Sequence, residues 1–201
     1  MCSFFVPMSA KAEGVARAGY VNGFNDQFTA NTGNWVPLYG SSWSYSRRGS
    51  VIIGKGQTKQ WTGILFSKAQ YANFEYEVKM KRIGCDTCTN QLFIRSSKVG
   101  IIYYGYTNSG FFTIYSCNSV SCTTWQSFKA SDIIVKFGSN TLKVLAVNND
   151  YKFYINKRVV YSRTVTGPLT LIKTGYVGVD FYSTSAVWHS LDVDFAILVK
   201  K

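Results

Sequence analysis

Apolar residues recur at every second position along residues 141–161, TLKVLAVNNDYKFYINKRVVY. A period of two places alternate side chains on one face of a β-strand, here including Leu142 and Val144. Two polar clusters interrupt the pattern, Asn148-Asn149-Asp150 and Asn156-Lys157. Because Asn and Asp tolerate the positive φ that hairpin loops require, the segment predicts three antiparallel strands joined by tight turns.

Similar signals continue along the chain, where short runs rich in β-branched and aromatic residues are separated by Gly, Asn and Ser clusters. No segment shows the 3.6-residue period of an amphipathic helix. The predicted strands are residues 43–47, 51–54, 64–67, 73–82, 90–96, 100–107, 111–116, 123–128, 141–147, 151–156, 159–162, 176–182 and 190–199. Many short strands at regular spacing predict an all-β fold, a sandwich or barrel of antiparallel sheets.

The length of 201 residues fits one domain, because all-β sandwiches often run to about 200–250 residues as a single unit. We expect a single β-sandwich domain over residues 21–201, preceded by an N-terminal extension over residues 1–20. In that extension, Ala10 and Ala12 form the small-x-small pattern of a signal-peptidase site, although the basic start of a signal peptide is missing. The extension is therefore either the remnant of an export signal or an ordinary chain terminus. No later apolar run approaches the roughly 20 residues that span a bilayer, so we expect no transmembrane segment and a secreted or cell-surface protein.

The composition adds a surplus of aromatic rings and a strong positive charge. Aromatic residues make up 16% of the chain, enough for a buried core with rings left over. Lys and Arg number 22 against 10 Asp and Glu, a formal net charge of +12. Such a charge attracts acidic polysaccharides, anionic cell surfaces or nucleic acids, or it simply keeps the surface soluble. The bases are spread along the chain, and together with export this disfavours nucleic acid as the partner.

Four of the five cysteines are paired in sequence inside predicted loops, Cys85 with Cys88 and Cys117 with Cys122. We expect two short-range disulfides, in keeping with export. The C-x2-C and C-x4-C spacings also suit the two halves of a four-thiolate zinc site. If the intervening strands run antiparallel in one sheet, however, the two loops lie at its opposite ends, which disfavours zinc.

Several strand-shaped motifs between Gly23 and Lys200 form a characteristic order. They are FNDQF (24–28), GNW (33–35), GILFS (63–67), YANFEYEV (71–78), QLFIR (91–95), FYIN (153–156) and VDF (193–195). This order resembles the concanavalin A-like lectin/glucanase superfamily, and more narrowly the laminin-G-like jelly rolls and the glycoside-hydrolase-16-like domain of unknown function 1080. The resemblance implies an antiparallel two-sheet jelly-roll sandwich with one concave face, and a function in binding or cleaving carbohydrate.

Two acids on one predicted strand raise the question of catalysis. Glu75 and Glu77 share a face, because they alternate with Phe74 and Tyr76. An i, i+2 pair on a strand is about 7 Å apart, against about 5–5.5 Å for retaining and about 6.5–9.5 Å for inverting glycosidases. The resemblance implies a three-acid E-x-D-x-E array in the hydrolases, whereas Lys79 stands in the third place here. A solvated strand face of alternating acids and bases is therefore favoured, with hydrolysis by Glu75 and Glu77 as the alternative.

Other enzyme classes find less support. His189 is the only histidine, which excludes a multi-histidine metal site and leaves little for a Ser-His-Asp triad. No nucleotide-binding glycine motif precedes a helix. Polysaccharide lyases on similar jelly rolls neutralise a uronate with Arg or Gln beside a Tyr or His base. Arg95 and Gln91 supply such parts, although the strand motifs of lyases are absent.

Binding without catalysis requires flat rings and a few polar groups on an exposed sheet face. If Leu92 and Ile94 point into the core, Phe93 and Arg95 occupy the opposite face of the same strand. The outward positions of the next strands bring further rings to this face. We therefore expect a ligand-binding platform of Phe93, Arg95, Tyr115 and Trp125. The alternative is that a loop or the N-terminal segment covers these rings.

Asp194 matches a final-strand aspartate that the resemblance links to a structural calcium, and Asp26 is the second candidate ligand. No other cofactor is expected. The sequence thus predicts an exported, non-catalytic, lectin-like module that binds polysaccharide or another glycan, including acidic ones. The alternatives are a glycoside hydrolase or polysaccharide lyase, and a structural or adhesive subunit that self-assembles outside the cell.

Overall fold

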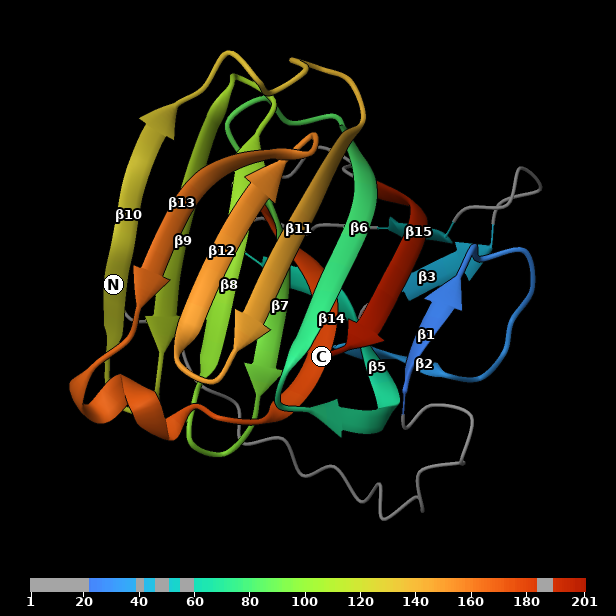
Figure 1. The fold of residues 1–201 in the computed structure, drawn as a ribbon. Helices are drawn as coiled ribbons and strands as arrows, with labels where there is room; N and C mark the ends of the chain where they lie inside the picture. The colour runs from blue at the N-terminus through green and yellow to red at the C-terminus, as the bar shows by residue number, and fades with distance from the viewer. Residues whose placement is uncertain (1–21, 39–41, 46–50, 55–59, 184–189) are drawn as a thin grey trace.

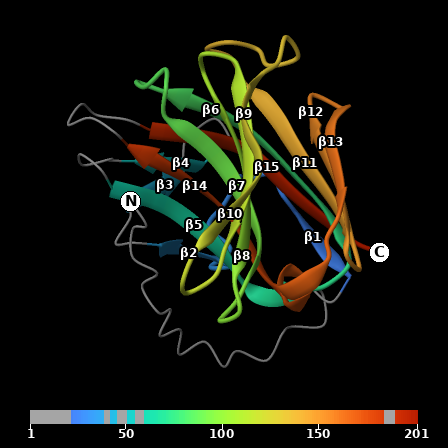
Figure 2. The same ribbon diagram turned by 90° about the vertical axis from the view of Figure 1, so that its left-hand side faces the viewer.

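The computed structural model describes residues 22–38, 42–45, 51–54, 60–183 and 190–201. These residues form two antiparallel β-sheets packed face to face (Figure 1), and a view turned by 90° shows the two layers beside each other (Figure 2). The predicted all-β sandwich is therefore confirmed. The predicted N-terminal extension, with Ala10 and Ala12, lies outside the described residues.

The elements are β1 (Gly23–Asp26), β2 (Trp35–Leu38), β3 (Ser42–Tyr45), β4 (Val51–Gly54), β5 (Gln60–Tyr71), β6 (Phe74–Ile83), β7 (Thr89–Ser96), β8 (Ile101–Thr107), β9 (Phe111–Cys117), β10 (Cys122–Ala130), β11 (Asn140–Val147), β12 (Asp150–Ile155), β13 (Arg158–Thr164), a 3-10 helix (Gly167–Leu171), β14 (Gly175–Ser183) and β15 (Ser190–Lys200). The described residues contain no helix that is long and apolar enough to cross a membrane.

The first sheet has the order β13-β12-β11-β6-β15-β4-β3, with β1 also pairing with β15, and is called the eight-stranded sheet below. The second has the order β10-β9-β8-β7-β14-β5-β2 and is called the seven-stranded sheet. The chain changes sheet repeatedly, for example between β5 and β6, between β10 and β11, and between β14 and β15. These exchanges build the two-sheet jelly roll that the sequence resemblance predicted.

The predicted three-stranded segment is confirmed as β11, β12 and β13, which pair in order at one edge of the eight-stranded sheet. Its turns use the expected residues: Asn148, Asn156 and Lys157 have φ values of 53°, 48° and 72°. This is the left-handed conformation that Asn accepts more readily than most residues.

The core lies between the sheets and is filled from alternate strand positions. In β6, Phe74, Tyr76 and Val78 are buried, while Glu75 and Glu77 between them are not. Rings from distant strands meet in this layer, as where Phe24 stacks on Phe66 with ring centres 4.0 Å apart. Each large apolar side chain buried in this way stabilises the fold by about 1.5–3 kcal/mol.

The strand prediction was incomplete at the N-terminal end. It omitted both β1 and β2. Pro37 suggests a break in β2, but the structure tolerates this proline because β2 is an edge strand of the seven-stranded sheet. It also found only residues 64–67 of β5, which runs from Gln60 to Tyr71. The missing part of β5 contains Trp61, which proves central to the site described below.

Both predicted disulfides are present, Cys85–Cys88 and Cys117–Cys122. The first closes the loop by which the chain passes from β6 to β7, and the second closes the hairpin between β9 and β10. Thr89 pairs with Thr107 at one end of β8, and Cys117 pairs with Ile101 at the other. The two cysteine pairs therefore lie at opposite ends of the sheet, as expected, and do not form a four-thiolate zinc site.

Candidate functional site

A row of small and polar side chains crosses the middle of the seven-stranded sheet on its outer face. Strand register places Asp180 of β14 between Gly63 of β5 and Gln91 of β7, and continues the row through Gly105 to Thr113. Their neighbours Val179, Leu92 and Ile114 belong to the core. Because successive residues of a strand point to opposite faces, the row faces away from the core.

Glycine is required in this row by the space available. A Cβ atom on Gly63 would lie 2.5 Å from the Cβ of Asp180. A Cβ atom on Gly105 would lie 2.7 Å from the Cβ of Gln91. The two glycines therefore make room for the side chains of Asp180 and Gln91.

Aromatic residues flank this row on both sides. On one side, register aligns Phe93, Tyr103 and Tyr115 across β7, β8 and β9. On the other side, Trp61 of β5 pairs with Tyr182 of β14. Phe93 lies over Gly178, where an added Cβ would be only 2.2 Å from its ring.

The rings lean toward one another above the row. Two strands, β14 and β7, separate the strands that carry Trp61 and Tyr103, yet the ring centres are 6.2 Å apart and the rings are nearly parallel. Tyr103 stacks on Tyr115 at 4.9 Å, and Trp61 meets Tyr182 at 5.0 Å. Asp180 and Gln91 are both 0% exposed. The rings of Trp61, Tyr103, Tyr115 and Tyr182, called the aromatic floor below, therefore cover these two polar groups.

An open groove of about 380 Å³ runs beside this floor. We call it the aromatic groove; its lining residues are Trp61, Thr89, Thr113, Tyr115, Thr124, Ser127, Phe128 and Tyr182. The lining combines four aromatic side chains with four Thr and Ser side chains, and it includes no Asp, Glu, Lys or Arg. This volume falls within the range of small-molecule sites.

Asp180 is the only carboxyl group on the strands of the seven-stranded sheet. Burial raises the pKa of its carboxyl well above the ordinary value, while the neighbouring Gln91 side chain acts in the opposite direction. Neither carboxyl oxygen has a hydrogen bond of normal geometry to a described residue. Tyr115 donates to Oε1 of Gln91 at 3.1 Å, which fixes one end of the amide. Because the Asp180 side chain is 0% exposed, it cannot contact a ligand in the groove as a nucleophile or base.

Phe93 and Tyr115 of the predicted platform lie on this face, but the prediction for Arg95 was wrong. Arg95 adopts a φ of 52°, and the pairing of β7 with β14 shifts register at this point. The irregularity turns its side chain into the sandwich, where it is 1% exposed. Arg95 donates to the carbonyl oxygens of Asn148 at 2.9 Å and Ile172 at 3.1 Å, and to the hydroxyl of Tyr151. Arg95 thus links the turn between β11 and β12 of the eight-stranded sheet to the segment that precedes β14 of the seven-stranded sheet.

The prediction that Trp125 belongs to the platform was also wrong. Thr124 pairs with Tyr115 and Gln126 with the adjacent Ile114, so Trp125 is the extra residue of a β-bulge. The bulge turns its indole inward, where it is 8% exposed. Its Nε1 donates to Ser116 Oγ at 2.9 Å, and its ring meets Tyr151 at 5.3 Å.

The acidic pair Glu75 and Glu77 lies on the outer face of the eight-stranded sheet, in a different layer from the aromatic groove. Lys143 Nζ is 3.4 Å from one oxygen of Glu75, and Lys201 Nζ is 3.6 Å from the other. Acids and bases therefore alternate on a half-exposed face, which is the arrangement that the strand pattern favoured. No described residue of the groove comes from β6.

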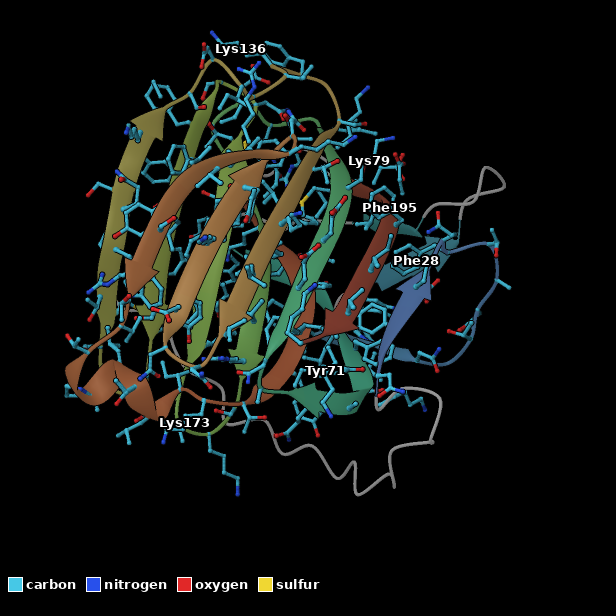
Figure 3. The ribbon with its side chains drawn as sticks, in the orientation of Figure 1. Phe28, Tyr71, Lys79, Lys136, Lys173 and Phe195 are labelled. Carbon is cyan, nitrogen blue, oxygen red and sulfur yellow. A yellow bond between two sulfur atoms is a disulfide. The ribbon has the colours of Figure 1, made fainter. Side chains whose placement is uncertain are left out.

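The two candidate calcium ligands already have other partners. Asp26 accepts hydrogen bonds from the backbone N–H of Phe28 and from Trp35 Nε1, both at 2.8 Å. Asp194 forms an ion pair of 2.7 Å with Lys79, which Figure 3 shows close to Phe195. The described residues contain no cluster of three or more His, Cys, Asp or Glu able to hold a metal ion. Calcium binding by Asp26 and Asp194 stays a prediction.

Sequence reasoning missed most residues that line the groove, and it missed Asp180. The signal for Asp180 was present, since it is a lone acid within the apolar strand YVGVDFY of residues 176–182. Trp61 was missed because Thr62 and Gly63 separate it from the apolar run that begins at Ile64. Ser127 and Phe128 lie within a register shift of β10 between Gln126 and Lys129, which no sequence pattern predicts.

No protein-family model matches this chain, and no curated relative matches it. Several solved structures, however, match this chain over most of its length. The β-glucanase of Bacillus licheniformis matches with a TM-score of 0.71 and 12% identity, covering 90% of this chain and 99% of that one. A lichenase derived from a mouse hindgut metagenome matches with a TM-score of 0.69 and 8% identity, covering 90% and 100% of the two chains. The carbohydrate binding module CBM66 from Bacillus subtilis matches with a TM-score of 0.59 and 17% identity, covering 83% and 92%.

These likenesses extend over most of each chain at low identity, so they establish the fold. The protein has the concanavalin A-like jelly roll that its strand motifs resemble. The same fold is present in an enzyme and in a binding module, and its function must therefore be argued from the site.

Proposed function

We propose that this protein binds carbohydrate in the aromatic groove without catalysing a reaction. The observation that carries the proposal is an open groove in which Trp61, Tyr115 and Tyr182 present rings beside four Thr and Ser side chains. Sugars are held by rings that stack on the apolar face of a pyranose and by polar groups that bond its hydroxyls. The groove offers both kinds of contact.

The proposed ligand is a neutral glycan. The residues that line the groove carry no ionised side chain, although the chain as a whole has a formal charge of +12. An acidic sugar buried against aromatic rings would lose hydration without gaining a cationic partner. The positive charge therefore acts elsewhere on the molecule.

The absence of catalysis is supported by the distribution of carboxyl groups. Glycoside hydrolysis usually requires two carboxyl groups that flank the scissile bond. Asp180 is the sole carboxyl on the strands of the seven-stranded sheet, and the aromatic floor covers it. Hydrolysis by Glu75 and Glu77 is the alternative, and it would require the substrate to bind on the opposite sheet.

The fold comparisons favour carbohydrate as the ligand class, because the proteins of similar fold are described as glucanases and as a carbohydrate binding module. We further propose that the protein is exported. Its two disulfides support this, since structural disulfides persist in oxidising compartments.

A glycan array tests the binding proposal with the wild type, Trp61→Ala and Tyr182→Ala. We expect the wild type to capture neutral glycans and each variant to lose most of the signal, because stacking against a ring is lost. Phe137→Ala is the matched control, since Phe137 is exposed outside the groove, and it should bind like the wild type. Absence of capture by the wild type, or equal capture by Trp61→Ala and Tyr182→Ala, would refute the proposal.

Release of reducing sugar from the captured glycans distinguishes binding from hydrolysis. We expect none from the wild type. Release that is lost in Glu77→Gln and retained in Trp61→Ala would instead support an enzyme with its site on the eight-stranded sheet.

A further inference from the structure

Arg82 is a buried cation that has no hydrogen-bond partner among the described residues. It is the last core-facing residue of β6 and is 2% exposed. None of its three guanidinium nitrogens has a partner. Its guanidinium carbon lies 3.9 Å from the centre of the Phe181 ring. Such a cation–π contact stabilises a desolvated cation by about 2 kcal/mol, whereas burying an ion costs several kcal/mol.

Asn90 points into the same part of the core. On β7, Asn90 pairs in register with Phe181 of β14 and with Tyr106 of β8. It is 0% exposed, and neither its Nδ2 nor its Oδ1 has a partner among the described residues. Arg82 lies over the Phe181 ring and also influences the pKa of Tyr106. The two unpaired side chains therefore face one location between the sheets.

A loop that is held by a disulfide and two hydrogen bonds closes this end of the sandwich. Arg82 precedes and Asn90 follows the loop that the Cys85–Cys88 disulfide closes. Asn108 Nδ2 donates to the carbonyl oxygen of Cys85 at 3.4 Å, and the N–H of Ser109 donates to that of Asp86 at 3.1 Å. The loop is thereby attached to the turn between β8 and β9. This leaves the carboxamide oxygen of Asn108 unpaired as well.

The charge of Arg82 is not balanced by the residues around it. Burial lowers the pKa of its guanidinium to about 9, so the group is still protonated at neutral pH. No carboxyl group of the described residues forms an ion pair with it. A guanidinium offers five N–H donors and no acceptor, so an anion suits it better than another donor.

We propose that Arg82 and Asn90 bind one small monovalent anion between the sheets, with the guanidinium and the Asn90 Nδ2 as donors. One negative charge balances the single buried positive charge, whereas a divalent anion would leave an unpaired negative charge in the core. The enclosed position favours an ion of the size of chloride. Asn90 pairs with the core residue Phe181, whereas the adjacent Gln91 pairs with Asp180 on the outer side of the sheet, so this site lies on the opposite face from the proposed carbohydrate site.

Thermal unfolding in chloride tests this proposal. Sodium chloride replaces sodium gluconate at constant ionic strength, because gluconate is too large for an enclosed site. Near saturation, the midpoint should rise by about 3–6 °C for each tenfold increase in chloride. Arg82→Met keeps an aliphatic stem over Phe181 and should show no rise. Arg158→Met removes an exposed cation and should respond like the wild type.

Crystals of the wild type in sodium bromide supply a second measurement that does not depend on the folding of a variant. We expect an anomalous peak within hydrogen-bonding distance of the Arg82 guanidinium. The proposal is overturned if the wild type shows no specific chloride response, or if Arg82→Met responds equally. Electron density at Arg82 that has no anomalous signal and fits water alone would overturn it as well.

Discussion

Tyr115 on β9 donates a hydrogen bond of 3.1 Å to Oε1 of Gln91 on β7, across the intervening strand β8. The residue of β8 between Gln91 and Thr113 is Gly105. Its lack of a side chain lets the phenol reach over the strand to the amide. The hydrogen bond therefore couples the orientation of a ring in the aromatic groove to the buried row beneath it.

Gly105→Ala should destabilise the protein by about 1–3 kcal/mol, because the new methyl group overfills a packed space. It would lie 2.7 Å from the Cβ of Gln91, 2.7 Å from Cγ2 of Thr89 and 2.8 Å from a backbone oxygen. Guanidinium unfolding measures the loss. Ser162→Ala, on the exposed side of β13, is the control and should change the free energy of unfolding by less than about 0.5 kcal/mol. Equal stability of both variants would show that the row is not tightly packed.

Trp125→Ala should reduce the free energy of unfolding by about 3–5 kcal/mol, the usual loss when a large buried ring is removed. The side chain packs on Tyr151 and donates to Ser116, so its removal leaves both a cavity and an unpaired hydroxyl. Phe137→Ala removes a ring that is 56% exposed and should have a small effect. If chemical denaturation ranks the two variants equally, Trp125 is not a core residue.

Asp180→Asn should change how stability depends on pH. The folded-state pKa of Asp180 is raised above its unfolded value, so its contribution is fully present below the unfolded pKa and is lost as pH rises through the folded pKa. The Asn variant stays neutral at every pH. We therefore expect similar stabilities at about pH 3.5 and a growing advantage of Asp180→Asn toward pH 8, by about 1.4 kcal/mol for each unit by which the pKa is raised.

Denaturation midpoints over this pH range measure the difference. Asp132→Asn changes the net charge by the same amount at an exposed position and separates the general effect of charge from that of burial. Parallel profiles for Asp180→Asn and the wild type would show that the carboxyl is already hydrated in the folded protein.

The fold was predictable from sequence because alternation is a local signal. The buried residues of β11 and β12, such as Leu142, Val144 and Phe153, recur at a period of two, and Asn148 and Asn156 mark the turns. The disulfides were predictable for the same reason, since each pair lies within one loop.

The site was only partly predictable, because its composition depends on departures from alternation. Simple alternation put Arg95 and Trp125 on the outer face, but a left-handed residue at one position and a bulge at the other turned both inward. The approach of Trp61 to Tyr103 depends on a sheet order in which β14 separates β5 from β7. Strand neighbours that are distant in sequence leave no periodic signal.

Strands β14 and β15 follow all other described strands along the chain, yet each occupies an interior position in its sheet. β14 joins β7 to β5, and β15 joins β6 to β4 and also pairs with β1. During synthesis, the segments on either side of these positions emerge from the ribosome before the strands that connect them. The seven-stranded sheet can therefore not close until β14 has been synthesised, and the eight-stranded sheet not until β15 has followed. The nascent chain must hold unpaired strand edges until then.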